Sequence, residues 1–160
     1  IENLIRIYNI SCDIVNKNDI KLILCSIDNI PYSHKQIMSK CLLMKYFGYY
    51  FSDEDYEAVS HELVDYSNSY IIDDKRIFNI AKYLFDFFSQ NTYRLNANNI
   101  VSFIINIFDS NLRRWYDDCC KLIQKINFKN VSKEEQLKLQ RILINVVNNS
   151  EVRTNINELE

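Results

Sequence analysis

The pattern closest to a metal-binding motif is HELVD at residues 61–65, in which a histidine and an aspartate lie four positions apart. On a helix His61 and Asp65 would project from one face, where they could share a metal ion while Glu62 acts as a general base. Catalytic zinc sites use three protein ligands, and the only other histidine is His34. We therefore interpret the pattern as the polar face of an acidic helix, and we predict no metal site and no cofactor.

Two pairs of adjacent aspartates could in principle perform acid-base or nucleophilic chemistry. Asp73-Asp74 stands where a helix is predicted to begin, so we interpret it as a cap. Asp117-Asp118 follows Arg113-Arg114 by four residues, a spacing that pairs opposite charges on one helix face. The single glycine excludes phosphate-binding glycine loops, nucleophile elbows and dinucleotide fingerprints. We predict no catalytic residue, and we expect a protein that is not an enzyme.

The cysteines form an odd set of five without a CxxC pair: Cys12, Cys25, Cys41, Cys119 and Cys120. Neighbours on a helix point about 100° apart, which discourages joint binding of a soft metal by Cys119 and Cys120. We interpret the cysteines as reduced thiols of small core residues, and we expect a cytoplasmic protein.

Length and composition indicate one domain, residues 1–160, that is rich in helices. The chain has one glycine and one proline, whereas average usage of about 7% and about 5% would give roughly eleven and eight. Tight turns between strands need these residues, so their scarcity favours helices joined by Asn, Asp and Ser loops. The chain starts at Ile1 without Met and ends inside a helical pattern, so we expect a trimmed chain or a piece of a longer one.

The formal net charge of −2 gives no overall basic footprint, so we expect neither a nucleic-acid binder nor an anionic-membrane binder. No stretch reaches the roughly 18 apolar residues that a membrane span needs, so we also expect no membrane segment.

Apolar periodicity, interrupted by polar residues, predicts the helices. They cover residues 2–15, 19–28, 33–47, 52–69, 73–88, 100–108, 111–127 and 132–148, and one more is predicted to begin at Ser150. The helix over 73–88 is apolar around most of its circumference and is the predicted centre of the fold. The run IVSFIINIF at 100–108 also fits a buried strand, but we prefer a helix because a lone strand would have no partner.

The run KYFGYYFSDEDYE at residues 45–57 holds the only glycine beside a cluster of aromatic and acidic residues. Gly48 is predicted to be the left-handed residue that ends one helix. Ser52 is predicted to cap the next, with the following acids favoured by the helix dipole. We interpret this run as the end of a helix, a loop and the start of another helix.

A basic residue recurs near the start of the second helix of each predicted pair: Lys35, Arg76, Arg113 and Arg153, separated by 41, 37 and 40 residues. DSNLRR and NNSEVR resemble the turn-and-helix signature of HEAT repeats, in which an acid or amide caps the second helix and a basic residue projects from it. The resemblance implies an all-α fold, a right-handed α-α superhelix of about four helix pairs. An irregular helical bundle is the alternative.

Charge is distributed unevenly along the chain. Residues 52–74 carry eight acids and no Lys or Arg, whereas basic residues outnumber acids from Arg113 to Arg141. Such asymmetry steers and orients a charged partner, and the acidic stretch suits a basic one.

Our leading hypothesis is a non-catalytic protein-binding module or scaffold, for example an immunity or regulatory protein that neutralises a basic toxin. The resemblance implies that the second helices of the pairs line the partner-binding face, and the acidic stretch and the aromatic loop add further candidates. The candidate partner-binding residues are Lys35, Asn79, Lys82, Asp86, Arg114, Asp118, Lys121, Lys125, Glu57, Glu62, Asp65 and Tyr50.

The sequence is also compatible with two other functions. DNA glycosylases built from HEAT-like repeats use an Asp, an aromatic residue and basic residues on a concave face, a composition that Trp115, Asp117, Asp118 and Lys121 imitate. The chain could also be a helical segment of a larger NTPase or defence protein. The sequence does not encode the identity of the partner or the oligomeric state.

Overall fold

The structure of the chain is a computed structural model that describes residues 16–30, 33–70 and 74–157. Within these ranges the chain is all-α, with seven α-helices, three short 3₁₀ turns and no strand. The predicted helix over residues 2–15 lies outside them. The α-helices are α2 (Lys17–Ile27), α3 (Ser33–Phe47), α4 (Asp53–Tyr70), α5 (Asp74–Gln90), α6 (Ala97–Asp109), α7 (Tyr116–Ile123) and α8 (Lys133–Asn157). The 3₁₀ turns are η1 (Gly48–Tyr50), η2 (Arg113–Trp115) and η3 (Phe128–Asn130).

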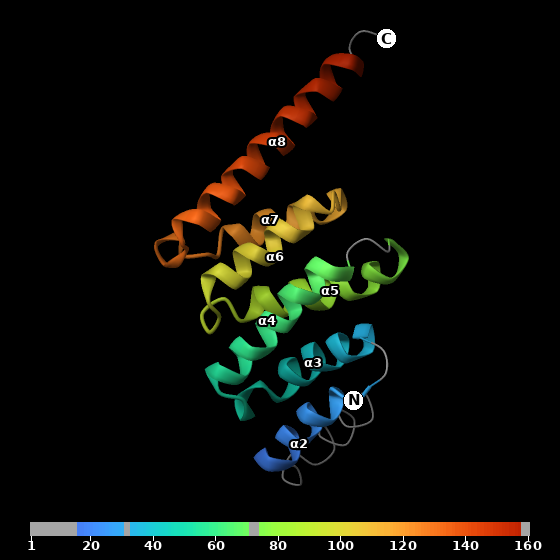
Figure 1. Ribbon diagram of the computed structural model, residues 1–160, viewed down its shortest axis with the longest axis vertical. Helices are drawn as coiled ribbons and strands as arrows, with labels where there is room; N and C mark the ends of the chain where they lie inside the picture. The colour runs from blue at the N-terminus through green and yellow to red at the C-terminus, as the bar shows by residue number, and fades with distance from the viewer. Residues whose placement is uncertain (1–15, 31–32, 71–73, 158–160) are drawn as a thin grey trace.

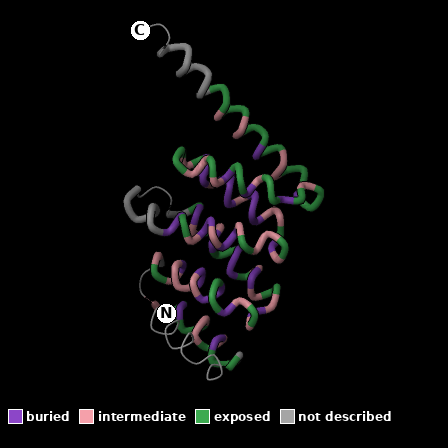
Figure 2. Tube along the Cα trace, turned by 180° about the vertical axis from the view of Figure 1, so that it is seen from behind, coloured by how far each residue is buried: buried purple, intermediate pink, exposed green. Residues whose placement is uncertain are grey.

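The helices follow one another along the long axis of the molecule, from α2 at one end to α8 at the other (Figure 1). In one row α4 packs on α6 and α6 on α8, and in a second row α3 packs on α5 and α5 on α7. Helix α2 packs on α3 and is joined to α4 by an ion pair between Lys21 Nζ and Asp55 Oδ2, 3.1 Å apart. Helices α3 and α4 therefore pack most extensively on the helix two places ahead, and α5 and α6 on the helix two places behind; buried residues line these contacts (Figure 2).

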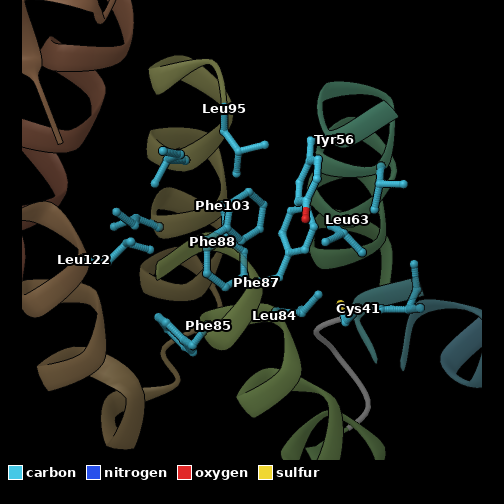
Figure 3. Packing of buried hydrophobic residues seen from close by; sticks show 14 of the residues in the cluster. Cys41, Tyr56, Leu63, Leu84, Phe85, Phe87, Phe88, Leu95, Phe103 and Leu122 are labelled. Atoms are coloured by element: carbon cyan, nitrogen blue, oxygen red, sulfur yellow. The ribbon is translucent and has the colours of Figure 1, made fainter. Parts of the chain in front are cut away.

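Helices α5 and α6 supply the aromatic centre of the core (Figure 3). The rings of Phe88 and Phe103 stack with centroids 4.5 Å apart, and Phe85 meets Phe103 edge to face at 5.0 Å. The prediction that residues 73–88 form a helix covered on several sides is confirmed for residues 80–88, of which six are buried. Residues 100–108 are helical, so the alternative of a strand is wrong.

Polar side chains hold α6 against α4 at two points seven residues apart. Asn99 Nδ2 donates to Ser60 Oγ at 2.9 Å, and Asn106 Nδ2 donates to Ser67 Oγ at 2.8 Å. From the first contact to the second, the residue number increases by seven on both helices, so α4 and α6 run parallel. Ser60 and Ser67 are fully buried, and buried polar groups need such partners because water cannot replace them. The two contacts therefore favour one register between the helices.

Gly48 does not have the left-handed conformation that was predicted for it, because its φ is not positive and it begins η1. The absence of a side chain matters for another reason. A Cβ at this position would lie 2.2 Å from Tyr56 Oη. Tyr56 is 3% exposed, and its hydroxyl donates to the carbonyl oxygen of Met44 at 3.2 Å. Gly48 therefore makes room for a buried tyrosine on the following helix.

The C-terminal third of the chain departs from two predicted boundaries. Asn111 has a φ of 55°, a conformation that asparagine tolerates, and the predicted helix over 111–127 is divided into η2 and the shorter α7. Helix α8 continues past Ser150 to Asn157, so no new helix begins there. Ser132 caps α8 as predicted, since its Oγ accepts from the Glu135 N–H at 3.2 Å. The N–H of Ser132 donates to Asn98 Oδ1 of α6 at 2.8 Å, which ties the start of α8 to its neighbour.

The described cysteines divide into two classes. Cys41 and Cys119 are buried, as predicted for core residues, and burial raises the pKa of both thiols. Cys25 and Cys120 are exposed, so their interpretation as core residues is wrong. In the described part of the chain no helix is long and apolar enough to cross a bilayer.

Candidate functional site

A groove of about 970 Å³ opens where α4 and α6 begin. One wall is the first two turns of α4, the second is the α5–α6 loop with the start of α6, and the third is the segment that joins α7 to α8. Leu95, Ile100 and Ile126 contribute apolar surface, while most of the other lining residues are polar or charged. A volume near the upper end of the range of about 300–1,000 Å³ suits a ligand or a segment of another chain.

The α4 wall carries carboxylates whose positions follow from the helix start. Ser52 caps α4, because its Oγ accepts from the Asp55 N–H at 3.3 Å while its own N–H donates to Asp55 Oδ2 at 2.8 Å. This cap fixes the first turn, from which Asp53 and Glu54 project to solvent. A hydrogen bond from its own backbone N–H and another from the Ser52 hydroxyl lower the pKa of Glu54. Glu54 is therefore held ionised at neutral pH.

Glu57 joins the α4 wall to the start of α6. Its Oε2 accepts from the Asn96 N–H at 2.9 Å, and its Oε1 accepts from Asn99 Nδ2 at 2.9 Å. The carboxylate thus satisfies a backbone donor just before α6, where the helix dipole favours negative charge. A predicted partner-binding residue is consequently also part of the scaffold.

Arg94 fixes the α5–α6 loop on top of α4. Its guanidinium lies 4.0 Å from the centroid of the Tyr56 ring, and its Nε donates to Asp53 Oδ1 at 2.7 Å. The same guanidinium donates to the carbonyl oxygens of Phe51 at 3.0 Å and Gly48 at 3.5 Å. The charges of Arg94 and Asp53 therefore compensate each other inside the groove wall.

The remaining rim is formed by the α5–α6 loop and by the segment between α7 and α8. Tyr93 is 82% exposed. Lys125 Nζ donates to the carbonyl oxygen of Ser89 at 3.2 Å and to Ser89 Oγ at 2.5 Å, so its ammonium is bound near the end of α5. Asn127 Oδ1 accepts from the Lys129 N–H at 3.2 Å, and Asn130 is exposed beside it. The rim thus offers an aromatic ring and amide groups.

Of the twelve candidate residues from the sequence, Glu57 and Lys125 line this groove. Glu62 pairs with Lys40, and Asp65 is exposed further along α4. Tyr50 is half-buried, with its ring centroid 4.0 Å from that of Tyr49. The remaining candidates lie on or beside the row of α3, α5 and α7: Lys35, Asn79, Lys82, Asp86, Arg114, Asp118 and Lys121.

Several of these candidates already have partners. Asp86 Oδ2 lies 3.2 Å from Lys45 Nζ, and Asp118 Oδ1 lies 3.8 Å from Lys121 Nζ. The guanidinium of Arg114 lies 5.7 Å from the centre of the Trp115 ring. Lys35 and Lys82 are exposed, whereas the side chain of Asn79 lies outside the described residues.

The candidates from the sequence do not include the other lining residues of the groove, among them Glu54, Tyr93, Arg94, Asn127 and Asn130. Their only local signal is a set of polar, aromatic and amide residues in loops, which also fits ordinary turns. The groove exists because three segments distant in sequence, residues 53–58, 92–100 and 125–130, meet at one end of the rows.

The residues considered for catalysis are engaged elsewhere. His61 Nε2 lies 3.5 Å from Glu57 Oε1, and Glu62 is bound to Lys40, so neither His61 nor Glu62 meets Asp65 around a metal position. In the described ranges no group of three or more His, Cys, Asp or Glu side chains converges to hold a metal ion. Trp115 stacks on Phe85 of the core with centroids 5.3 Å apart, away from the groove.

Comparison with protein-family models, with curated proteins and with solved structures finds no match to this chain.

Proposed function

We propose that this chain is a HEAT-like helical-repeat module that binds a basic protein partner without catalysing a reaction. The observation that carries the proposal is the groove at the start of α4 and α6, which combines apolar surface with the ionised wall of an acidic helix. Interfaces of this kind gain affinity from buried apolar surface and orientation from complementary charge.

The repeat assignment is supported by the spacing of contacts between helices. Asp53 meets Arg94 and Lys45 meets Asp86, both 41 residues apart, while Glu57 meets Asn99 at 42 residues. These separations are close to the 37 to 41 residues between the recurring basic residues. Helices that pack two places along the chain are the arrangement expected of a solenoid, which exposes an extended surface for partners.

The charge expected of the partner follows from the exposed carboxylates of α4. Its exposed carboxylates Glu54 and Asp65 form no ion pair within the described residues, whereas Asp53 is paired with Arg94 and Glu62 with Lys40. A basic toxin or another basic protein would complement this helix. The exposed thiols of Cys25 and Cys120 fit a reducing compartment, so we place the interaction in the cytoplasm.

The test is an affinity measurement with an identified partner. The immobilised chain is used to retain proteins from an extract of its source cells, and the retained partner is then produced alone and titrated by calorimetry. The double variant Glu54→Lys/Asp65→Lys reverses two exposed charges and is expected to weaken binding most at low salt. Glu57 and Glu62 are left unchanged because both support the fold.

Two results would contradict the proposal. One is a partner that binds the double variant and the original chain equally at every salt concentration. The other is binding of a DNA duplex whose logarithmic affinity falls linearly with the logarithm of salt concentration, which would favour a nucleic-acid enzyme instead.

A further inference from the structure

We propose that the groove receives an extended segment of the partner and that one lysine or arginine side chain of this segment lies beside Glu54 and Tyr93. The inference rests on the proposed protein-binding function and specifies the part of the partner that is recognised. It follows from the charges that remain uncompensated in the groove, from the amide groups on its walls and from the exposed ring at its rim.

The first step is to separate compensated charges from uncompensated ones. Asp53 is paired with Arg94, whereas the ammonium of Lys125 is bound to the neutral Ser89 and keeps its positive charge. Glu54 and Glu57 are the lining carboxylates without a Lys or Arg partner among the described residues. Glu57 receives neutral donors and lies 3.5 Å from His61 Nε2. Neutral donors orient a carboxylate without cancelling its charge, so Glu54 and Glu57 outnumber Lys125 by one charge and the groove complements a cation.

The second step concerns the form of the ligand. Asn127 uses its Oδ1 to cap η3, which leaves its Nδ2 donor available, and the side chain of Asn130 makes no hydrogen bond within the described part of the chain. Each asparagine amide can donate and accept, as a peptide unit does. A helix satisfies its own backbone groups, whereas an extended segment carries unpaired N–H and C=O groups. The amides therefore favour an extended segment.

The third step is the position of Tyr93. With 82% of its surface exposed, this residue gains little from the core, and an aromatic face in a groove lined by carboxylates attracts a cation. Tyrosine also loses little conformational entropy on binding, which suits a contact residue. Tyr93 and Glu54 lie on different walls of the groove, so a side chain entering between them could contact both.

The experiment uses the complete chain and a fluorescein-labelled nonapeptide of alternating serine and arginine, followed by fluorescence anisotropy. A serine-glutamate nonapeptide controls for charge sign, and a backbone N-methylated serine-arginine nonapeptide controls for backbone contacts. Spermine, a polycation without a peptide backbone, is the competitor. Circular dichroism of each variant checks that the exposed substitutions leave the fold intact.

The matched variants make the same charge change inside and outside the groove. Glu54→Lys and Asp65→Lys each change the net charge of α4 by +2. The two sites are eleven residues apart, about 16 Å along a helix. This distance is roughly two screening lengths at physiological salt. Tyr49→Ala, at another exposed tyrosine outside the groove, is the matched control for Tyr93→Ala.

We expect the serine-arginine peptide to bind saturably and at least ~tenfold more weakly to Glu54→Lys, because a charge-assisted contact is replaced by repulsion. Tyr93→Ala should weaken binding ~threefold, while Asp65→Lys and Tyr49→Ala should change it less than ~twofold. N-methylation should also weaken binding, and spermine should compete poorly.

The inference is overturned if Asp65→Lys weakens binding as much as Glu54→Lys does. It is also overturned if the N-methylated peptide binds equally well, or if no binding occurs at about 1 mM peptide, a concentration that would reveal even weak affinity. If the double variant Glu54→Lys/Asp65→Lys loses affinity for the partner but the peptides do not bind the original chain, only the groove inference is refuted. Failure of the partner measurement as well would remove the proposed function.

Discussion

Replacing Gly48 by alanine tests the close approach of Tyr56 to η1. The new Cβ would lie 2.2 Å from Tyr56 Oη, more than 1 Å inside an ordinary contact. Tyr56 cannot withdraw easily, because Arg94 covers one side of its ring at 4.0 Å and Phe87 lies 6.0 Å from it. Overpacking of this kind costs about 1–3 kcal/mol. Alanine also restricts the unfolded chain, which offsets about 0.4–1 kcal/mol, so we expect Gly48→Ala to destabilise by about 1–2 kcal/mol.

The second substitution, Tyr56→Phe, distinguishes this explanation from a helix-ending glycine. It removes the hydroxyl, and the next ring atom, Cζ, would lie 3.5 Å from the alanine Cβ, an ordinary contact. Alone it costs about 0.5–1.5 kcal/mol through the lost hydrogen bond to Met44. In the Tyr56→Phe background, Gly48→Ala should therefore be neutral or slightly stabilising.

The assay is urea unfolding of all four proteins followed by far-UV circular dichroism, with the slope of the transition compared to check for a common mechanism. We expect a coupling free energy of about 1–3 kcal/mol between the two sites. A left-handed helix end would instead make alanine unfavourable whatever residue stands at position 56. Coupling below about 0.5 kcal/mol would refute the reasoning.

Four other predictions concern the scaffold and the thiols. Lys40 is buried between the more exposed Asp28 and Glu62. The double variant Asp28→Asn/Glu62→Gln leaves the Lys40 ammonium unpaired and should lower the free energy of unfolding in urea by about 3 kcal/mol. Lys40→Met, which removes the buried charge, should lower it by about 1 kcal/mol. Burial lowers the pKa of Lys40, but the hydrogen bonds and charges of the two carboxylates raise it overall. The stability difference between the native chain and Lys40→Met should therefore be constant at pH values below the unfolded pKa near 10.5. It should fade as the pH rises through the raised pKa of the folded state. Arg94→Lys cannot reproduce the fork to Asp53 and the carbonyl oxygen of Phe51 and should lower the midpoint of urea unfolding, whereas an unchanged midpoint would contradict the clamp. Mass spectrometry after brief iodoacetamide treatment should find Cys25 and Cys120 alkylated and Cys41 and Cys119 protected until urea is added; early alkylation of Cys41 would contradict its burial.

Local patterns predicted the elements best where capping and periodicity agreed. Helix α3 has the predicted bounds, Ser33–Phe47, and Ser52 and Ser132 cap α4 and α8 as expected. The prediction failed at Ser150, because a serine followed by a glutamate caps a helix only if the backbone leaves the helical conformation before it. Gly48 shows the same limit, since the group that needs its space is eight residues away on the next helix.

The groove could not be predicted because no local pattern reports it. Its walls come from the first turns of α4, from residues 92–97 and from residues 125–130. The recurrence of basic residues near 40 positions did not indicate that Glu57 would be occupied by the start of α6, or that Arg94 would compensate Asp53. Those outcomes depend on side-chain packing across rows.

The matched polar contacts between α4 and α6 have a mechanical consequence. Asn99 with Ser60 and Asn106 with Ser67 repeat after seven residues in both helices, so a slide of two turns would re-form one contact and break the other. Smaller slides would break both contacts and cost the buried Asn99 and the half-buried Asn106 a hydrogen-bond partner each. Under a force that slides α6 along α4, the two helices should therefore move relative to each other in discrete steps and not by gradual shear.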